Sequence, residues 1–429
     1  MILTALRYLP ESVFLIINIT KRKVTKTTLV GGIHMNFGKV DQLVENIVHN
    51  YGIPCCDLSI YYKHQEVFRR REGFVNLEGT KPAGEDDLYF LCSCSKMALT
   101  TAAMQLVEKG LISLSDPVSK YLPEFGEMKV QQGDKLVPCE REATIEDLLS
   151  MRAGLNYKNL APGERPDMEE MARKQPEAGT REFIRQFLKT PLEFQPGTRF
   201  LYSMCHDVMG AVIEVVTGMR YRDYIAENIT KPLGMKTLEY HLRPEDRERV
   251  VQHYTCNINA QNQIHSPLLF PMNKDVVATM GTFGPNYDSA GGGVISTVSD
   301  YVLLADALAN GGVGANGARI LSRASIDDMR TNRLTTQQMF DDHALRMQDY
   351  GYGYGLGGRT LMDPRAAKSP VGEYGWDGWA GAYFLADVEN NVAIFFAMSV
   401  GMMLNVKALV HNKLRDYTYE ALADELGNA

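Results

Sequence analysis

Two side chains three positions apart, a serine and a lysine, form the first pattern in this sequence that could do chemistry. They are Ser93 and Lys96 in the segment Ser93-Cys94-Ser95-Lys96, directly before a long apolar run. If this segment begins a helix, its first and last residues share one face, so the Lys96 amine reaches the Ser93 hydroxyl. A partly desolvated lysine has a lowered pKa and can take the hydroxyl proton, which makes Ser93 a nucleophile. Free N–H groups at the helix start would favour negative charge developing at Ser93.

This serine–lysine spacing is common by chance and does not identify an active site alone. Its ordinary interpretation is a serine that caps a helix and a lysine on the surface. A second segment adds to it: a Pro196-Gly197 turn leads into Tyr202-Ser203-Met204 and then another apolar helix. A phenol near a cation can pass a proton between nucleophile, leaving group and water. Without the serine and lysine, Tyr202 would be interpreted as a half-buried core tyrosine.

The third segment, Trp-Asp-Gly-Trp-Ala-Gly at residues 376–381, contains both tryptophans of the chain. Its glycines allow a ligand to approach the backbone closely. We expect this segment to enter a strand whose edge offers a backbone N–H to an oxyanion. Two tryptophans of the core, or of a lid, are the alternative interpretation.

Taken in this order, the three segments resemble the serine β-lactamase and penicillin-binding-protein family, in the branch that joins class C β-lactamases, D-aminopeptidases, DD-peptidases and esterases. The resemblance covers most of residues 40–425. Further matching segments are residues 111–125, 148–155, 231–235 and 289–293. Because several independent segments agree, the resemblance outweighs the ordinary interpretation of each one.

The resemblance implies an acyl-enzyme mechanism. Ser93 would attack an acyl carbon, Lys96 and Tyr202 would share the proton transfers, and water would hydrolyse the acyl-enzyme. The backbone N–H groups of Ser93 and Trp379 would form the oxyanion hole. The general base is disputed even among well-studied relatives. No metal and no cofactor is implied, and the nine histidines form no H-x-x-x-H or H-E-x-x-H pattern of hydrolytic zinc.

Two departures from the family pattern bear on the substrate. Met204 stands where the second motif commonly has asparagine, so an amide that helps to hold the lysine and the substrate's acylamide group is missing. Trp376, Asp377 and Gly378 replace the frequent Lys-Thr-Gly and are similar to the Trp-x-Gly of the family's esterases. Asp377 would put a negative charge where relatives bind a substrate carboxylate, which disfavours anionic substrates.

We therefore expect a serine hydrolase, esterase-like, that acts on a small-molecule ester or amide. Its expected substrate-binding residues are Trp376, Asp377, Gly378 and Met204. A β-lactamase, or a D-amino-acid peptidase or DD-peptidase, is the first alternative. A non-catalytic descendant that binds a ligand or serves as a scaffold is the second, and the joint presence of Ser93, Lys96 and Tyr202 argues against it.

The elements that must position these residues follow from hydrophobic periodicity. Residues 40–50 carry the apolar stripe of an amphipathic helix, and residues 58–62 and 67–71 predict a β-hairpin. Residues 96–109 predict a buried helix that ends at Gly110. Residues 353–358 match G-x-G-x-x-G by letter, but their alternating glycine and tyrosine predicts a strand edge rather than a nucleotide site.

The C-terminal part alternates again between helix and strand. We expect Ser299 to cap an apolar helix that runs to Leu308. Residues 381–388 and 392–399 predict two strands around a polar turn, and a last helix spans about residues 404–425.

These elements predict an α+β fold of the β-lactamase/transpeptidase type, an antiparallel sheet flanked by helices with an inserted, mostly helical lobe. Residues 36–116 and 286–429 would form the α/β lobe with the central antiparallel sheet, and residues 117–285 the helical lobe. We expect residues 1–35 to be an N-terminal extension, and whether it is genuine, disordered or the result of a misassigned start is left open.

Composition excludes several other classes of protein. The net charge of −7 gives no broad basic surface for nucleic acid or an anionic membrane. The apolar run at residues 13–19 is far shorter than the roughly 20 residues that span a bilayer. Seven cysteines without a C-x-x-C pair indicate reduced thiols, so the predicted location is the cytoplasm. The oligomeric state is left open.

Overall fold

The structure is a computed structural model in which residues 27–30, 33–157, 166–256, 269–273, 284–341, 347–401, 403 and 405–427 are described. Most of the predicted N-terminal extension lies outside these ranges. Its last part forms β1 (Thr27–Val30), which pairs antiparallel with β2 (Ile33–Asn36). Within the described ranges, no helix is long and apolar enough to cross a membrane.

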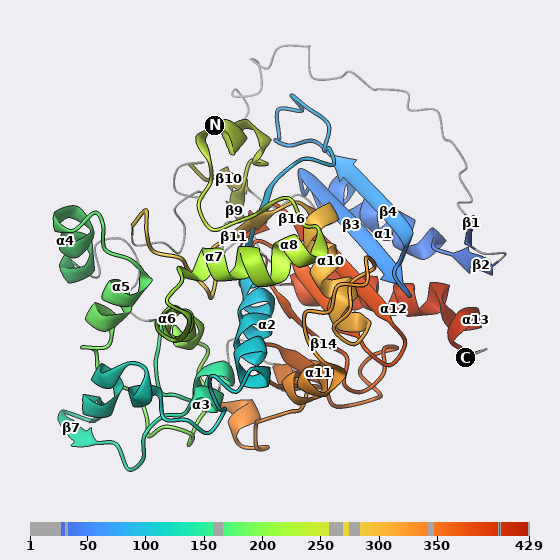
Figure 1. Ribbon diagram of the computed structural model, residues 1–429. Coiled ribbons are helices and arrows are strands. Elements are labelled where there is room, and N and C mark those ends of the chain that lie inside the picture. Colours follow the sequence, from blue (N-terminus) through green and yellow to red (C-terminus); the bar gives the residue numbers. More distant parts are fainter. Residues whose placement is uncertain are drawn as a thin grey trace, which may run out of the picture.

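A seven-stranded antiparallel sheet forms the centre of the molecule, in the order β12-β13-β14-β15-β16-β3-β4 (Figure 1). N-terminal strand β3 therefore lies beside C-terminal strand β16. Every residue of β16 is buried, which explains its continuous apolar sequence, since both faces of the sheet are covered. The strands are β3 (Cys55–Tyr62), β4 (Gln65–Gly73), β12 (Tyr352–Tyr354), β13 (Arg359–Leu361), β14 (Tyr374–Asp377), β15 (Tyr383–Asp387) and β16 (Val392–Met398).

Helices cover both faces of this sheet. On one face, α1 (Gly38–His49) and α12 (Asn412–Ala421) share an apolar core with alternate residues of β3 and β16. On the other face, α10 (Val298–Ala309) packs on β16, β15 and β3, and α2 (Ser95–Glu108) packs near β14. The result is a three-layered body in which α2 lies between the sheet and the helices of residues 145–233 (Figure 1).

Several predicted elements are confirmed. The helix expected at residues 40–50 is α1, the hairpin is β3–β4, and the buried helix is α2, which Gly110 follows with φ +66°. The two C-terminal strands are β15 and β16, which pair antiparallel. The glycine–tyrosine segment forms β12 at the edge of the sheet, as expected.

Two local predictions are wrong. The cap of α10 is Thr297, whose side chain accepts a hydrogen bond from the Asp300 N–H, and Ser299 lies inside the helix, where its hydroxyl meets Arg69. The last helix is three consecutive pieces rather than one: a π-helix at Lys407–His411, then α12, then α13 (Ala423–Leu426).

The predicted helical lobe, residues 117–285, is rich in short helices. Some of its strands pair with strands that lie outside this range. β8 (Leu238–Glu239) pairs with β11 (Val294–Ser296), and β9 (Tyr254–Cys256) pairs with β17 (Val400–Gly401). The lobe boundary at residue 285 stays a prediction. The longer helices of this segment are α3 (Ile145–Leu149), α4 (Pro166–Lys174), α5 (Thr180–Phe187), α6 (Cys205–Thr217) and α7 (Tyr221–Ile225).

Candidate active site

Ser93 lies in the sharp turn between β5 (Tyr89–Cys92) and the start of α2. The preceding residue, Cys92, has φ +50°, which is uncommon for a residue with a side chain and persists where the surroundings fix it. The Ser95 hydroxyl fixes this turn, because it donates to the Cys92 carbonyl at 2.5 Å and accepts from the Val294 N–H at 2.9 Å. The turn is thus attached to β11 and presents Ser93 at the helix N-terminus.

Lys96 is completely buried one helical turn after Ser93. Its Nζ lies 3.4 Å from Ser93 Oγ and donates to the Gly291 carbonyl at 2.5 Å. The same nitrogen stands 4.6 Å from the centre of the Tyr202 ring. Burial lowers the pKa of Lys96 to about 8. At neutral pH a useful fraction of this amine is therefore uncharged and able to take the Ser93 proton.

Tyr202 faces Ser93 from the other side. Its phenol accepts a hydrogen bond from Trp376 Nε1 at 3.1 Å and is hydrogen-bonded to the Ser93 side chain. Burial raises the pKa of Tyr202 above its ordinary value, against the effect of these two hydrogen bonds. The phenol therefore keeps its proton near neutral pH and can relay it to a leaving group.

The loop that carries Tyr202 is anchored by backbone hydrogen bonds. The Leu201 N–H donates to the Met151 carbonyl at 3.0 Å, and the Gly197 N–H donates to the Arg152 carbonyl at 2.8 Å. From the other side, the Gln338 amide donates to the Gly197 carbonyl at 2.8 Å. The Pro-Gly turn found in the sequence is therefore held between α3 and the segment that follows α11 (Arg323–Met329).

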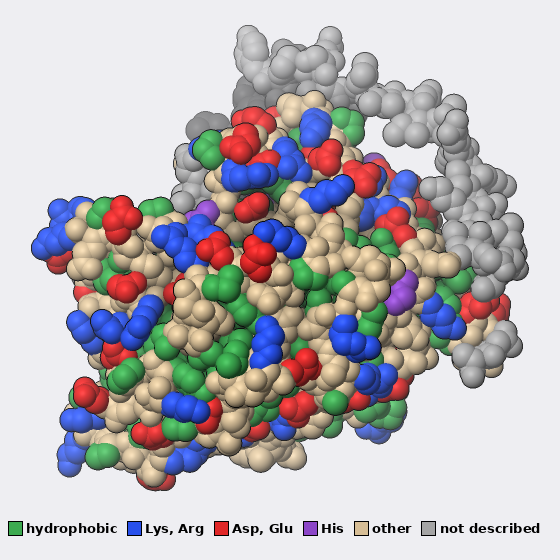
Figure 2. Space-filling view, in the orientation of Figure 1, with side chains coloured by type: hydrophobic (Ala, Val, Ile, Leu, Met, Phe, Trp, Pro, Cys, Tyr) green, Lys and Arg blue, Asp and Glu red, His purple; other side chains and the backbone are tan. Residues whose placement is uncertain are grey.

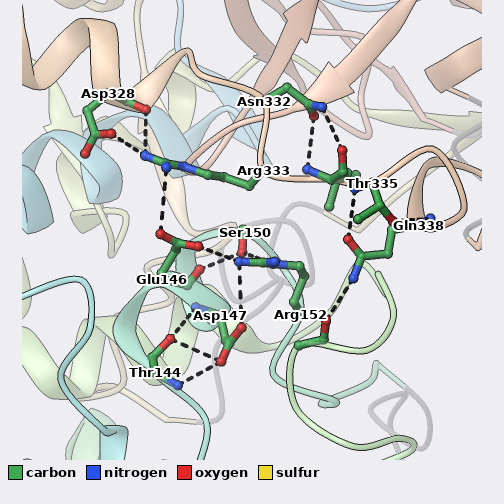
Figure 3. A network of polar contacts seen from close by, with 12 residues as sticks. Thr144, Glu146, Asp147, Ser150, Arg152, Asp328, Asn332, Arg333, Thr335 and Gln338 are labelled. Atoms are coloured by element: carbon green, nitrogen blue, oxygen red, sulfur yellow. Dashed lines mark hydrogen bonds and ion pairs between the residues drawn. The ribbon is translucent and has the colours of Figure 1, made fainter.

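A polar network connects these two anchors (Figure 3). The Arg152 guanidinium meets Glu146 at 2.6 Å and the Ser150 hydroxyl at 2.8 Å. Glu146 also lies 3.7 Å from Arg333, which is paired with Asp328 in α11. The network thus holds the segments that anchor the Tyr202 loop, through side chains of residues 144–152 and of residues 328–338.

The third predicted segment lies at the end of β14. Alternate residues of a strand face opposite sides, so Trp376 points toward Tyr202 while Asp377 points away from it. Asp377 accepts from Arg359 Nη1 at 2.6 Å and lies 3.8 Å from His411 Nδ1. Burial alone would raise the pKa of Asp377, but the Arg359 and His411 side chains hold it below its ordinary value.

This ion pair corrects the electrostatic argument from the sequence. Arg359 balances the charge of Asp377, so Asp377 does not repel an anionic substrate as a lone carboxylate would. The preference against anionic substrates follows from Trp376 instead. Its neutral indole, 5.4 Å from the Tyr202 ring, stands where the family's third motif commonly has a lysine. The strand thus offers no cation at that position.

The remaining predicted residues are Gly378, Trp379 and Met204. A Cβ at Gly378 would lie 2.4 Å from the Leu91 carbonyl oxygen, so glycine allows the end of β14 to approach the strand before Ser93. The Trp379 N–H points at this same turn, where it contacts the Cys92 sulfur, and its indole is 38% exposed. Met204 is buried in the apolar core at the start of α6. The oxyanion and substrate-binding roles of these residues stay predictions.

Two further buried residues, His206 and Asp207, lie near Lys96. His206 is hydrogen-bonded to the Leu149 carbonyl at 3.2 Å, and burial lowers its pKa to about 3, so it is neutral. Asp207 lies in the first turn of α6 and is hydrogen-bonded to the segment around Gly291. An aspartate at the start of an otherwise apolar helical run was the signal that could have drawn attention to it.

The described residues contain no cluster of three or more His, Cys, Asp or Glu side chains that could hold a metal ion. All seven cysteines are free thiols. Charged side chains of both signs are interspersed over the described part of the face shown in Figure 2.

The pKa of Lys96 predicts the pH dependence of the reaction. If the neutral amine accepts the Ser93 proton, kcat/KM should rise as the pH increases and level off above about 8. Below that value the rate should fall about tenfold per pH unit, because the protonated fraction of Lys96 grows. Initial rates of ester hydrolysis between pH 5.5 and 9.5 measure this profile, and a flat profile across that range would contradict the assignment of Lys96.

A serine at a helix start, a buried lysine one turn later and a tyrosine opposite both are the arrangement expected of a serine hydrolase in which lysine, in place of histidine, could act as the base. The fold and the sequence agree with this class. The sequence model of the Beta-lactamase family matches residues 40–420, and the chain belongs to this family. It is a serine hydrolase on an α+β fold of the β-lactamase/transpeptidase type, as expected.

Individual relatives include esterases. The chain is 27% identical to "Esterase EstB" of Burkholderia gladioli, over 77% of this chain and 82% of that protein. It is 28% identical to "Lovastatin esterase" of Penicillium rubens, over 74% of this chain and 80% of that protein. Among solved structures, it is similar in fold to "EstCE1, a hydrolase with promiscuous acyltransferase activity", with a TM-score of 0.72 and 22% identity over 89% of this chain and 97% of that one.

Proposed function

We propose that this protein hydrolyses neutral carboxylic esters through an acyl-enzyme formed on Ser93. The observation that carries the proposal is the convergence of two proton carriers on Ser93 Oγ. Lys96 Nζ lies 3.4 Å away, and the Tyr202 phenol is hydrogen-bonded to the same side chain. A hydroxyl is a weak nucleophile until a base takes its proton, and the buried amine is suited to that role.

The proposed reaction has two halves. Ser93 Oγ attacks the ester carbonyl while its proton passes to Lys96, and the backbone N–H groups of Ser93 and Trp379 bind the oxyanion. The intermediate collapses when the alcohol leaves with a proton supplied through Tyr202 and Lys96. Water then attacks the acyl-enzyme, gives up a proton along the same route, and releases the carboxylic acid and free Ser93.

The walls of the site favour neutral, apolar substrates. Tyr202 lies between the rings of Trp376, with centroids 5.4 Å apart, and Tyr157, with centroids 5.6 Å apart. Aromatic side chains of this kind contribute apolar contact area to a bound acyl or alcohol group. Two relatives are named as esterases, which agrees with this preference.

A panel of chromogenic substrates tests the proposal on purified protein. It contains a short-chain nitrophenyl ester, a chromogenic cephalosporin and a D-aminoacyl nitroanilide, each measured on the wild type and on Ser93→Ala. We expect the ester to be turned over by the wild type alone. Efficient cephalosporin or D-aminoacyl hydrolysis without ester hydrolysis would overturn the proposed substrate class. If the protein turned over none of the three substrates, the result would favour the alternative of a non-catalytic ligand-binding or scaffold protein.

A further inference from the structure

The active site lacks the amide that relatives place beside the lysine, because position 204 is a methionine. Met204 is 4% exposed and packs in the apolar core, so its side chain offers Lys96 no polar contact. A buried ammonium group is costly unless polar or charged partners stabilise it. Another residue must therefore hold Lys96.

Asp207, one helical turn after Met204, is such a residue. Its carboxylate is 2% exposed. Oδ1 accepts three hydrogen bonds: from the Tyr287 hydroxyl at 3.0 Å, from the Ser289 hydroxyl at 2.9 Å and from the Gly291 N–H at 3.4 Å. Burial raises the pKa of Asp207 above its ordinary value, and the nearby Lys96 amine and these three donors act against that rise by favouring the charged carboxylate.

Gly291 connects this carboxylate to the lysine. Its N–H faces Asp207, and its carbonyl accepts from Lys96 Nζ at 2.5 Å. A Cβ at Gly291 would lie 2.5 Å from Asp207 Oδ2 and 3.5 Å from Lys96 Nζ. The second carboxylate oxygen and the amine thus both lie close to the point where a Gly291 side chain would begin, and a side chain there would collide with the carboxylate.

We propose that Asp207 is a positioning residue for Lys96. Asp207 lies one helical turn after Met204 and takes over the role of the amide that Met204 cannot supply. This inference rests on the proposed function, because it assumes that Lys96 acts on Ser93. Asp207 holds the amine at the Gly291 carbonyl, within reach of the nucleophile, and supplies the negative charge that partly offsets the cost of burying its cation.

The negative charge of Asp207 has a measurable consequence for the amine. Burial lowers the pKa of Lys96, and Asp207 is the strongest of the groups that raise it again. The other ionisable groups acting on Lys96 or Asp207 are the thiols of Cys92, Cys94 and Cys205, the His206 imidazole, and the phenols of Tyr157, Tyr202, Tyr221, Tyr240 and Tyr287. Burial raises the pKa of each thiol and phenol and lowers that of His206, so all of them are neutral near pH 7.

The test is Asp207→Asn, which keeps the shape and an acceptor oxygen but removes the charge. Lys96 then loses protons more readily, so the acidic limb of kcat/KM should move to lower pH by about one unit. The plateau of kcat should fall about tenfold, because the amine is less well held. The matched control is Asp306→Asn in α10, a buried carboxylate that pairs with His64 at 2.8 Å, and it should leave the limb in place.

Tyr287→Phe keeps the inference testable if Asp207→Asn does not fold. It removes one donor from Oδ1, so Asp207 is protonated more readily and the limb should move in the same direction by less. An unmoved limb in both variants, with wild-type ester hydrolysis intact, would overturn the inference. If the wild type hydrolyses no ester and Ser93 is not labelled by a fluorophosphonate, the proposed function has failed before Asp207 is tested.

Discussion

Replacing Ser93 with alanine should lower kcat/KM for the nitrophenyl ester by about 10⁴-fold or more. The reason is that the other serine of the motif cannot take its place: the Ser95 hydroxyl is fully buried and bonded to the Cys92 carbonyl and the Val294 N–H. KM should change little, because the change removes no part of the aromatic wall. The measurement is steady-state hydrolysis, with fluorophosphonate labelling followed by mass spectrometry of the modified peptide.

Ser95→Ala is the matched control for this experiment, since it removes a hydroxyl two residues away in the same motif. It should lower the melting temperature, because the turn loses two buried hydrogen bonds, each worth about 1 kcal/mol. It should still be labelled at Ser93 by the fluorophosphonate. Labelling of Ser95 in the wild type, or activity retained in Ser93→Ala, would show that the nucleophile is misassigned.

Lys96→Met should have the second-largest effect, a loss of about 10³-fold in kcat. Methionine fills a similar volume but cannot accept the Ser93 proton, so the hydroxyl must react without a base. The pH profile should also lose the limb near 8 that Lys96 gives to the wild type. Single-turnover acylation with the nitrophenyl ester measures the affected step directly.

Lys109→Met provides the same substitution at the other end of α2. Lys109 is exposed and lies at the helix C-cap, so kcat and the pH profile should match those of the wild type. If Lys96→Met loses less than tenfold in kcat, the base is another group, and Tyr202 would be the next to test. Circular dichroism on each variant separates loss of chemistry from loss of fold.

Part of this site was predictable because two of its residues, Ser93 and Lys96, are close together in the sequence. Ser93 and Lys96 are separated by one helical turn, and helix geometry alone brings them together. The hairpins were predictable for the same reason, since alternation and turn residues encode them locally. Tyr202 and Trp376 were associated with this pair only through a resemblance, since nothing local relates positions 202 and 376 to position 93.

What the sequence by itself determined is the proximity of Ser93 and Lys96 and, through the order of its motifs, the kind of fold, while their roles as nucleophile and base stay predictions. Tertiary structure alone decided the charges around them. Asp377 was expected to face the substrate, yet Arg359 comes to it from a neighbouring strand and balances it. In the sequence, Asp207 was marked only as an aspartate at the start of an apolar helical run, but the chain returns at Gly291 and places it beside Lys96. Electrostatics depends on distance in space and on burial, and neither can be obtained from sequence separation.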